Sequence, residues 1–228
     1  MNDDARIIQA VNHTQVLRAP KQSLATFGIT DINYYLLTRP TYAPAEAEET
    51  VVRMGHVIAS RPRIVTPYYL SRLSGFSSDA RRYFQKLIEE HGADSPGIYY
   101  TYRNEPSGTD IVSDGLKAVL EKINADIDQR KDPLATIIQG EDTLWDVSLM
   151  KFIFEMTSAS LGNNLAEFHS RGLLDVEEGI PREARLNIEE MFKSIKEGSL
   201  EPRELQQELE RWGLFEAYQD RFFASFQR

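Results

Sequence analysis

Residues 50–60 read TVVRMGHVIAS, and this stretch decides the fold expected for the first half of the chain. Its side chains alternate between two sets, as they do on the two faces of a strand. One set is Val52, Met54, His56 and Ile58, and the other is Val51, Arg53, Gly55 and Val57. The alternation predicts a strand of a sheet.

Segments on both sides of this strand also have the composition of strands. Residues 24–37 (LATFGITDINYYLL), 63–70 (RIVTPYYL) and 97–105 (GIYYTYRNE) are rich in β-branched and aromatic residues. A hairpin about Arg61 and Pro62 is the simplest connection, and two strands separated in space are the alternative. Pro67 cannot donate to a ladder, so it predicts an edge strand or the end of a strand.

Two amphipathic helices are expected among these strands. Residues 77–92 (SSDARRYFQKLIEEHG) begin with serines that can cap a helix and end at Gly92, which predicts a left-handed stop. Apolar residues recur with helical spacing over 112–127, and Thr109 is the expected cap. Residues 1–20 predict a peripheral helix or arm that ends at Pro20.

Strand patterns disappear after Gly140, and helical patterns replace them. A helix is expected over 142–168, bent or ended at Gly162. Around LMKFIFEM (149–156) the apolar residues surround the helix axis, which predicts a central, buried turn. Further helices are expected to begin at Pro181 and Pro202, and an aromatic helix is expected over 215–226.

The pattern as a whole predicts an α+β protein. A small, mostly antiparallel sheet with flanking helices occupies the N-terminal part, 1–140, and an all-helical part follows over 141–228. The two parts form either one compact α+β domain or two units that meet near residue 140.

Composition excludes several classes of function. The 228 residues include no cysteine, so there is no disulfide framework, thiolate metal site or cysteine nucleophile. The net charge of −9 argues against nucleic acid as a partner. No apolar run is long enough to span a membrane, and the polar, acidic start predicts a cytoplasmic protein with no membrane partner.

Motifs that would indicate a cofactor or a metal are absent. There is no phosphate-binding GxxxxGK[ST] loop, no GxGxxG after a strand, no HExxH and no GxSxG. The four histidines are far apart in the sequence, so they predict no metal site. We therefore expect neither a cofactor nor a bound metal.

Arginines concentrate in the strand-rich middle of this acidic chain. Arg53, Arg61 and Arg63 are candidates to line a pocket for a small anionic ligand, because a guanidinium matches carboxylate and phosphate groups. The alternative is that they form ion pairs with the acidic helices. Tyr69 and Tyr100 belong to paired tyrosines and are candidates to stack on a nucleotide-like ligand, although tyrosine is also an ordinary strand residue.

Three residues are candidates for proton transfer. His56 shares a strand face with apolar residues, and Asp31 on a neighbouring strand is its expected partner if it is catalytic. Glu155 lies in the most apolar helix, where burial would raise the pKa of its carboxyl. Lys151 is placed one turn before it, so a structural ion pair is the alternative.

Two hypotheses of function follow. The first is a cytosolic non-enzymatic or regulatory protein with a small-molecule or partner site, whose short rear helices bury their apolar stripes by self-association, giving a homo-oligomer such as a homodimer. The second is an enzyme that acts on an anionic or nucleotide-like substrate. The enzyme requires the arginines, a tyrosine and a proton donor in one concave pocket, whereas the binding protein tolerates arginines dispersed among ion pairs.

Overall fold

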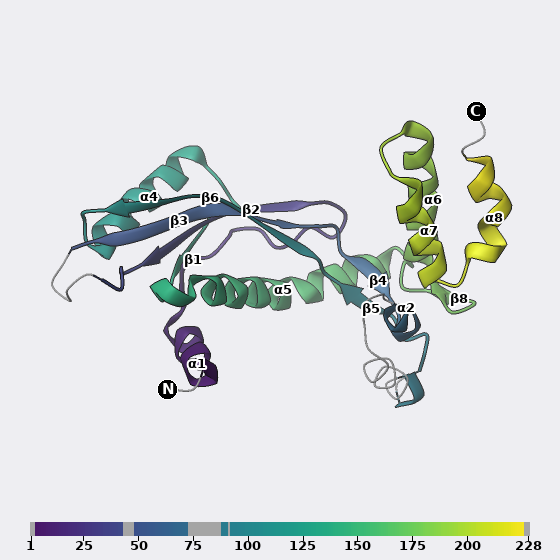
Figure 1. Ribbon diagram of the computed structural model, residues 1–228, viewed down its shortest axis with the longest axis horizontal. Helices are drawn as coiled ribbons and strands as arrows, with labels where there is room; N and C mark the ends of the chain where they lie inside the picture. Colours follow the sequence, from purple (N-terminus) through teal and green to yellow (C-terminus); the bar gives the residue numbers. More distant parts are fainter. Residues whose placement is uncertain (1–2, 43–47, 73–87, 91, 226–228) are drawn as a thin grey trace. The chain divides into compact units, whose positions relative to one another are not determined.

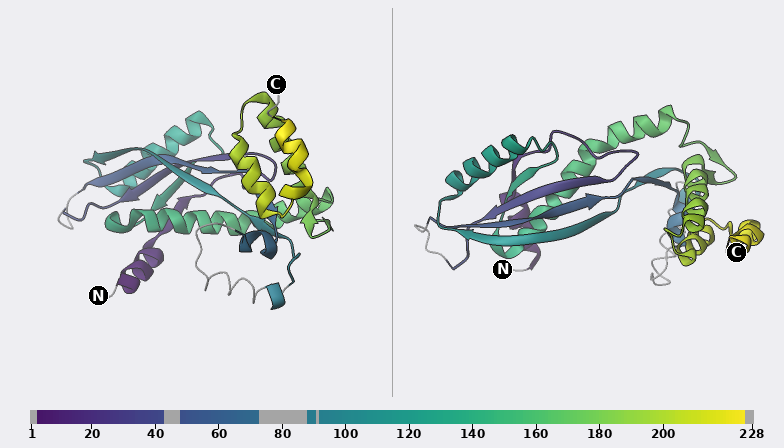
Figure 2. Two further views of the ribbon diagram at one scale, coloured as in Figure 1. Left: turned by 45° about the vertical axis from the view of Figure 1, so that its right-hand side comes forward. Right: turned by 90° about the horizontal axis from the view of Figure 1, so that it is seen from above.

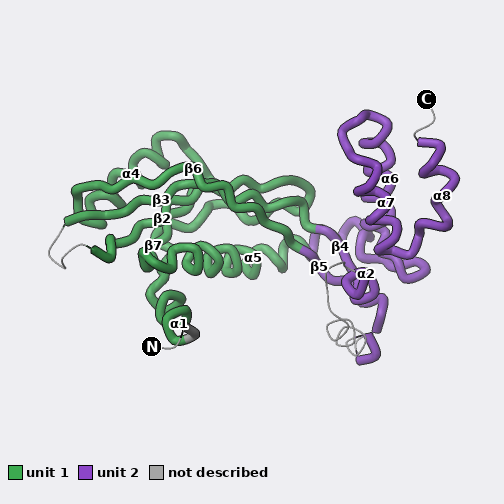
Figure 3. Tube along the Cα trace, viewed as in Figure 1, with its two compact units in different colours: residues 1–62, 100–164 green, residues 63–99, 165–228 purple. Residues whose placement is uncertain are grey.

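The computed structural model describes residues 3–42, 48–72, 88–90 and 92–225. The chain divides into two compact units, drawn in two colours in Figure 3. Unit 1 comprises residues 1–62 and 100–164, and unit 2 comprises residues 63–99 and 165–228. The parts expected from the sequence, 1–140 and 141–228, do not coincide with these units, because residues 63–99 belong with the C-terminal helices.

Unit 1 is built on a mixed sheet of five strands in the order β1-β7-β2-β3-β6. The strands are β1 (Gln15–Arg18), β2 (Thr30–Thr38), β3 (Thr50–Ala59), β6 (Tyr102–Val112) and β7 (Thr136–Gln139). The pair β2–β7 is parallel, and the other neighbours are antiparallel. The strand predicted over 50–60 is confirmed as β3, and the α+β class is confirmed with it.

Two helices cover the two faces of this sheet (Figure 1). The helix α4 (Leu116–Arg130) packs Val119 and Ile127 against one face. The helix α5 (Trp145–Ser170) packs Phe152 and Met156 against the other, and Figure 2 shows it running along the strands. Because successive strand residues face opposite ways, Leu36 of β2 joins the α5 core and Leu37 joins the α4 core.

Unit 2 is mainly helical and has a core of its own. Its helices are α2 (Pro67–Ser71), α6 (Arg182–Glu197), α7 (Pro202–Arg211) and α8 (Phe215–Ala224). Its strands form the pairs β4 (Arg63–Val65) with β5 (Gly97–Tyr99) and β8 (Val176–Glu177) with β9 (Ile180–Pro181). The core gathers Val65, Ile188, Phe192, Leu205 and Leu209 from three of these elements.

The expected hairpin about Arg61 and Pro62 is wrong. The strand β4 does not pair with β3 but with β5, in a separate sheet. The extended run predicted to Leu70 ends at Val65, because Pro67 takes the first position of α2, where its missing N–H costs no hydrogen bond. Tyr68 and Tyr69 are therefore helical residues.

Other elements of the structure also differ from the predictions. The first 20 residues form α1 (Asp3–His13) and then the short strand β1. The strand β6 continues to Val112, so the helix predicted from there begins at Leu116 as α4. The strand β7 was not predicted at all. A hairpin of two short strands, β8 and β9, with two residues each, interrupts the part expected to be all helical.

Several helix ends agree with the predictions. Gly198 ends α6 in a left-handed conformation, and Pro202 begins α7. The helix α5 follows the 3₁₀ helix η1 (Asp142–Leu144), but it passes Gly162 without ending. Of the helix predicted over 77–92, residues 77–87 and 91 lie outside the described residues, while 88–90 are helical and Gly92 has the expected positive φ of 87°.

Gly55 in β3 is required by close contact, which predicts a loss of stability on substitution. A Cβ at this position would lie 2.6 Å from Tyr34 Oη and 2.7 Å from the carbonyl oxygen of Glu105. Gly55→Ala should therefore lower the free energy of unfolding by about 1–3 kcal/mol. Gly108→Ala is the control, because its nearest atom would lie at 3.7 Å, an ordinary contact. Urea unfolding measures both, and equal stability of the two variants would contradict the packing argument.

Candidate functional site

Arg53 of β3 is held by a carboxylate of its own unit. Its Nη2 donates to Asp142 Oδ1 over 2.7 Å, and its Nη1 donates to Thr38 Oγ1 over 2.9 Å. The guanidinium also lies over the ring of Trp145, 5.7 Å from the ring centre. Arg53 thus joins β2 and β3 to the segment that leads into α5, and few of its donors remain for a ligand.

The three predicted arginines contact three different partners. Arg61 lies over the ring of Phe27 in unit 1, with 5.9 Å between its Cζ and the ring centre. Arg63 belongs to unit 2, where it pairs with Glu208. The predicted cluster of Arg53, Arg61 and Arg63 is therefore dispersed among separate contacts.

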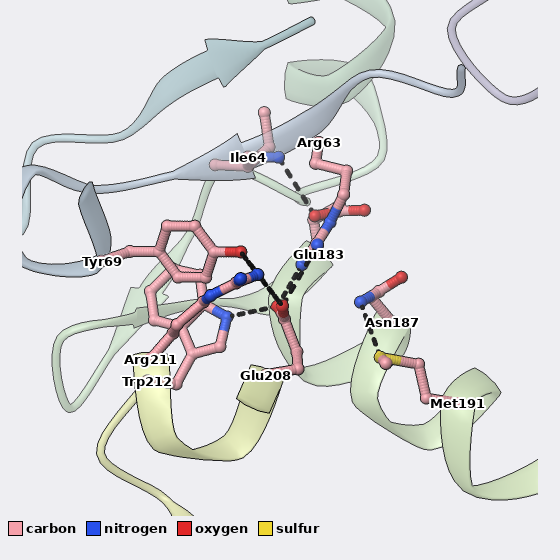
Figure 4. A network of polar contacts seen from close by, with 9 residues as sticks. All are labelled: Arg63, Ile64, Tyr69, Glu183, Asn187, Met191, Glu208, Arg211 and Trp212. Atoms are coloured by element: carbon pink, nitrogen blue, oxygen red, sulfur yellow. Dashed lines mark hydrogen bonds and ion pairs between the residues drawn. The ribbon is translucent and has the colours of Figure 1, made fainter. Parts of the chain in front are cut away.

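A buried polar network surrounds Glu208 in unit 2 (Figure 4). Both Nη atoms of Arg63 donate to its carboxylate, and Trp212 Nε1 donates over 2.9 Å. Tyr69 Oη donates to the same carboxylate over 3.0 Å. Tyr69 is 3% exposed and tilts against the ring of Trp212, so it presents almost no surface to a stacking ligand.

The charge of Glu208 is stabilised by these donors. Burial by itself raises the pKa of the Glu208 carboxyl, but the hydrogen bonds and charge of Arg63 outweigh it and, with Trp212 and Tyr69, lower the pKa below its ordinary value. Nearby, Glu183 accepts from the backbone N–H of Ile64 over 3.1 Å. The network joins β4, α2, α6 and α7, and every described contact of Glu208 is structural.

Tyr100 lies beside Tyr102 in unit 1, at the edge of the core shared with α5. The two rings are stacked, with centres 6.5 Å apart and an interplanar angle of 13°. Burial and the neighbouring Tyr102 raise the pKa of Tyr100 to about 12. Tyr100 and Tyr69 lie in different units. Tyr100 contacts Tyr102, and Tyr69 contacts Trp212.

The structure brings His56 and Asp31 together across neighbouring strands. His56 Nδ1 lies 2.8 Å from Asp31 Oδ1, and the side chains are 41% and 54% exposed. Asn33 faces His56 in the register of β2 and β3, which places the pair on the α4 side of the sheet. The geometry permits proton exchange between histidine and carboxylate, but the pair lies open to solvent.

Glu155 is not a buried carboxylate. It is 49% exposed, and its Oε1 lies 3.7 Å from Lys151 Nζ. Lys151 makes shorter contacts with the carbonyl oxygens of Val11 and Thr14, each at 3.0 Å. These bonds fasten the end of α1 to α5, so Lys151 has a structural role.

The turn of α5 expected to be wholly buried is exposed on one side. Leu149, Phe152 and Ile153 face the sheet, but Met150 is 64% exposed and Phe154 is 72% exposed. Leu161 continues the exposed apolar side at 40%. We call Met150, Phe154 and Leu161 the α5 face. The sequence feature that corresponds to this face is the placement of apolar residues all around the helix axis.

Within the part of the chain that the structure describes, no group of three or more histidine, aspartate or glutamate side chains is placed to hold a metal ion. No described helix is long and apolar enough to cross a membrane. Comparisons with protein-family models, curated proteins and solved structures find no match to this chain. Its function has to be inferred from its own residues.

Removing the charge of Glu208 should destabilise the protein. Glu208→Gln leaves Arg63 buried without its carboxylate, which should cost about 3–5 kcal/mol in free energy of unfolding. Glu189→Gln is a matched control, because Glu189 pairs with Arg221 at the surface and both are nearly half exposed. Urea unfolding at neutral pH measures the two losses, and an equal, small loss in both variants would contradict the structural role of the network.

The stability gap between the original chain and Glu208→Gln should depend on pH. Because the folded-state pKa of Glu208 is lowered, its contribution is fully present above the unfolded pKa of about 4.3 and is lost as pH falls through the folded value. The gap should therefore be constant above about pH 5 and shrink below about pH 4. Unfolding curves across this range measure it, and a gap that stays constant down to pH 2.5 would contradict the lowered pKa.

Proposed function

We propose that this chain is a non-enzymatic binding protein that associates with a second copy of itself through the α5 face. The single observation that carries the proposal is the exposure of Met150 and Phe154 in the N-terminal half of α5. Large apolar side chains grouped on one helix face are typical of a surface that another molecule covers. Each gains free energy on burial in proportion to the apolar area removed from water.

The spacing of the α5 face favours a second copy as the occupant. Phe154 and Leu161 lie seven residues apart on this face. Two α5 helices related by an antiparallel two-fold axis would place Phe154 opposite Leu161 of the second copy. Leu161 would then lie opposite Phe154 of the second copy, so the two contacts are equivalent and the face is complementary to itself.

The middle of the face is suited to close approach. Thr157 and Ser158 lie at the centre of the spacing, where the two-fold axis would pass. Thr157 Oγ1 donates to the carbonyl oxygen of Ile153 over 2.6 Å, and Ser158 Oγ donates to that of Phe154 over 2.9 Å. Both hydroxyl groups are therefore bonded to the helix, and Thr157 Oγ1 is also bonded to Tyr102 Oη of β6. Their burial leaves no donor without an acceptor. Small side chains at this point allow the helix backbones to approach.

The dispersal of the arginines favours binding over catalysis on an anionic substrate. An enzyme of that kind requires Arg53, Arg61 and Arg63 to converge with a tyrosine and a proton donor. Arg53 and Arg63 are instead bonded to separate carboxylates. One observation favours the enzyme, which is the contact of His56 with Asp31. Neither residue contacts any of the three arginines in a described bond, so we prefer the binding protein.

Truncation of the α5 face should abolish self-association. The original chain should sediment as a reversible monomer–dimer equilibrium with a dissociation constant on the order of 10 µM, because one helix face is smaller than a standard interface. Phe154→Ser with Leu161→Ser should sediment as a monomer at about 200 µM, where the original chain is mostly dimeric. Ile111→Ser is the control, because Ile111 of β6 is also exposed, at 60%, but lies outside the face. A strictly monomeric original chain would overturn the proposal.

Cross-linking tests the antiparallel orientation, and the absence of cysteine makes single substitutions clean reporters. Ser158→Cys should form a disulfide-linked dimer, because residue 158 lies close to the expected axis. Met150→Cys should not, because the two copies of residue 150 would lie about 22 Å apart along the helices. Equal cross-linking of both variants would indicate parallel helices and contradict the proposed arrangement.

A further inference from the structure

A polar cavity of 470 Å³ lies in unit 1, at the edge where the parallel strands β2 and β7 end. Its walls come from four places: the end of α1, the residues after β2, the residues after β7 and the start of α4. The volume is in the range of pockets that bind small molecules. Neither His56 nor the α5 face lines it.

The walls of this cavity are held in place by contacts that join α1, α5 and the segment after β7. Gly140 follows β7 and approaches α5 so closely that a Cβ there would lie 2.2 Å from Ser148 Oγ. Ser148 is in turn bonded to Thr14 at the end of α1 over 2.7 Å. His13 Nδ1 lies 2.7 Å from Glu141 Oε1, which joins α1 to the segment after β7. A cavity with fixed walls loses little entropy when a ligand binds.

Both lining carboxylates already have partners. Asp142 accepts from Arg53 and Thr38, and its Oδ2 accepts from the backbone N–H of Thr41 over 3.3 Å. Burial raises the pKa of Asp142, but these hydrogen bonds and the charge of Arg53 outweigh it and lower the pKa, so the carboxylate stays ionised. Glu141 is paired with His13.

Arg39 differs from the other charged groups of the lining. It comes directly after β2 and is exposed, and no hydrogen bond or ion pair of its side chain occurs with any described residue. Its five N–H donors are therefore open to a ligand. This arginine was missed by the sequence reasoning, because Arg39-Pro40 marks the end of a strand and carries no binding motif.

Three carboxamides complete the polar lining. Asn12, Gln15 and Gln139 line the cavity, and none of their side chains has a hydrogen bond within the described part of the chain. Each offers two N–H donors and one carbonyl acceptor. Such groups match a ligand that carries several hydroxyl groups, because a hydroxyl both donates and accepts.

We propose that this cavity binds a small monocarboxylate that also carries hydroxyl groups, with Arg39 on the carboxylate and the carboxamides on the hydroxyls. The planar guanidinium of Arg39 matches a carboxylate through two parallel hydrogen bonds. A phosphate monoester carries close to two negative charges, and the nearby Glu141 and Asp142 oppose it more strongly than a single charge. The site does not depend on self-association through α5.

Calorimetric titration with gluconate, glucose and glucose 6-phosphate tests the site on the full chain. Each probe has six carbon atoms and several hydroxyl groups. Gluconate is an open chain, glucose and glucose 6-phosphate are rings, and the three differ in charge. Gluconate should bind, whereas glucose and glucose 6-phosphate should bind at least about tenfold more weakly, because each loses or mismatches the contact with Arg39. No binding of gluconate, or equal binding of glucose, would overturn the proposal. Tighter binding of glucose 6-phosphate would overturn the assignment to a monocarboxylate.

Two variants show whether the binding occurs in this cavity. Arg39→Gln should weaken gluconate about tenfold or more, and its melting temperature without ligand should stay the same because the side chain is exposed. Gln139→Glu should also weaken gluconate, because it adds a negative charge to the lining. Arg103→Gln is the control for loss of a positive charge, since Arg103 of β6 is 70% exposed and lies outside the lining. Equal affinity in Arg39→Gln and Arg103→Gln would overturn the proposal.

Discussion

The parallel ladder between β2 and β7 is the constraint on which unit 1 depends. Parallel neighbours cannot be joined by a tight turn, so the chain makes β3, β6 and α4 before it returns as β7. Because parallel strands end at the same edge, the residues after β2 and after β7 meet there. The N–H of Gly140 donates to the carbonyl oxygen of Leu37 and extends the pairing to that edge. The polar cavity and the start of α5 both follow from this ladder.

The same ladder explains why α5 has an apolar side that is exposed in the described part of the chain. The helix leaves the edge of β7 and runs along one face of the sheet, which buries its Phe152 side in the core. A sheet offers one face to a helix, so the opposite side of α5 gains nothing from this packing. Met150 and Phe154 occupy that opposite side. An apolar residue exposed there is unfavourable in a lone chain, and a second covering surface removes the cost.

Local sequence patterns predicted the features that depend on neighbouring residues, and they did not predict pairing between residues far apart in the chain. The alternation over 50–60 was sufficient for β3, and adjacent strands were sufficient to expect His56 beside Asp31. The strand β7 has only four residues, too few for a periodic signal. The carboxylate partners of Arg53 and Arg63 lie 89 and 145 residues away from them in the chain, so composition indicated an arginine cluster where folding produced separate ion pairs.

Polar side chains with a structural role in this protein are hydrogen-bonded within it, whereas those that are candidates to bind a ligand are at least partly exposed. Glu208 is the kind of buried carboxylate that works as an acid when its pKa is raised, but its donors lower that pKa and enclose it. An ionised carboxylate enclosed by its donors has no proton to donate and does not contact a ligand. At the edge of β2 and β7, Arg39 and the carboxamides line the cavity, and their side chains form no hydrogen bond with any described residue. Free donors on a rigid wall favour recognition of a ligand.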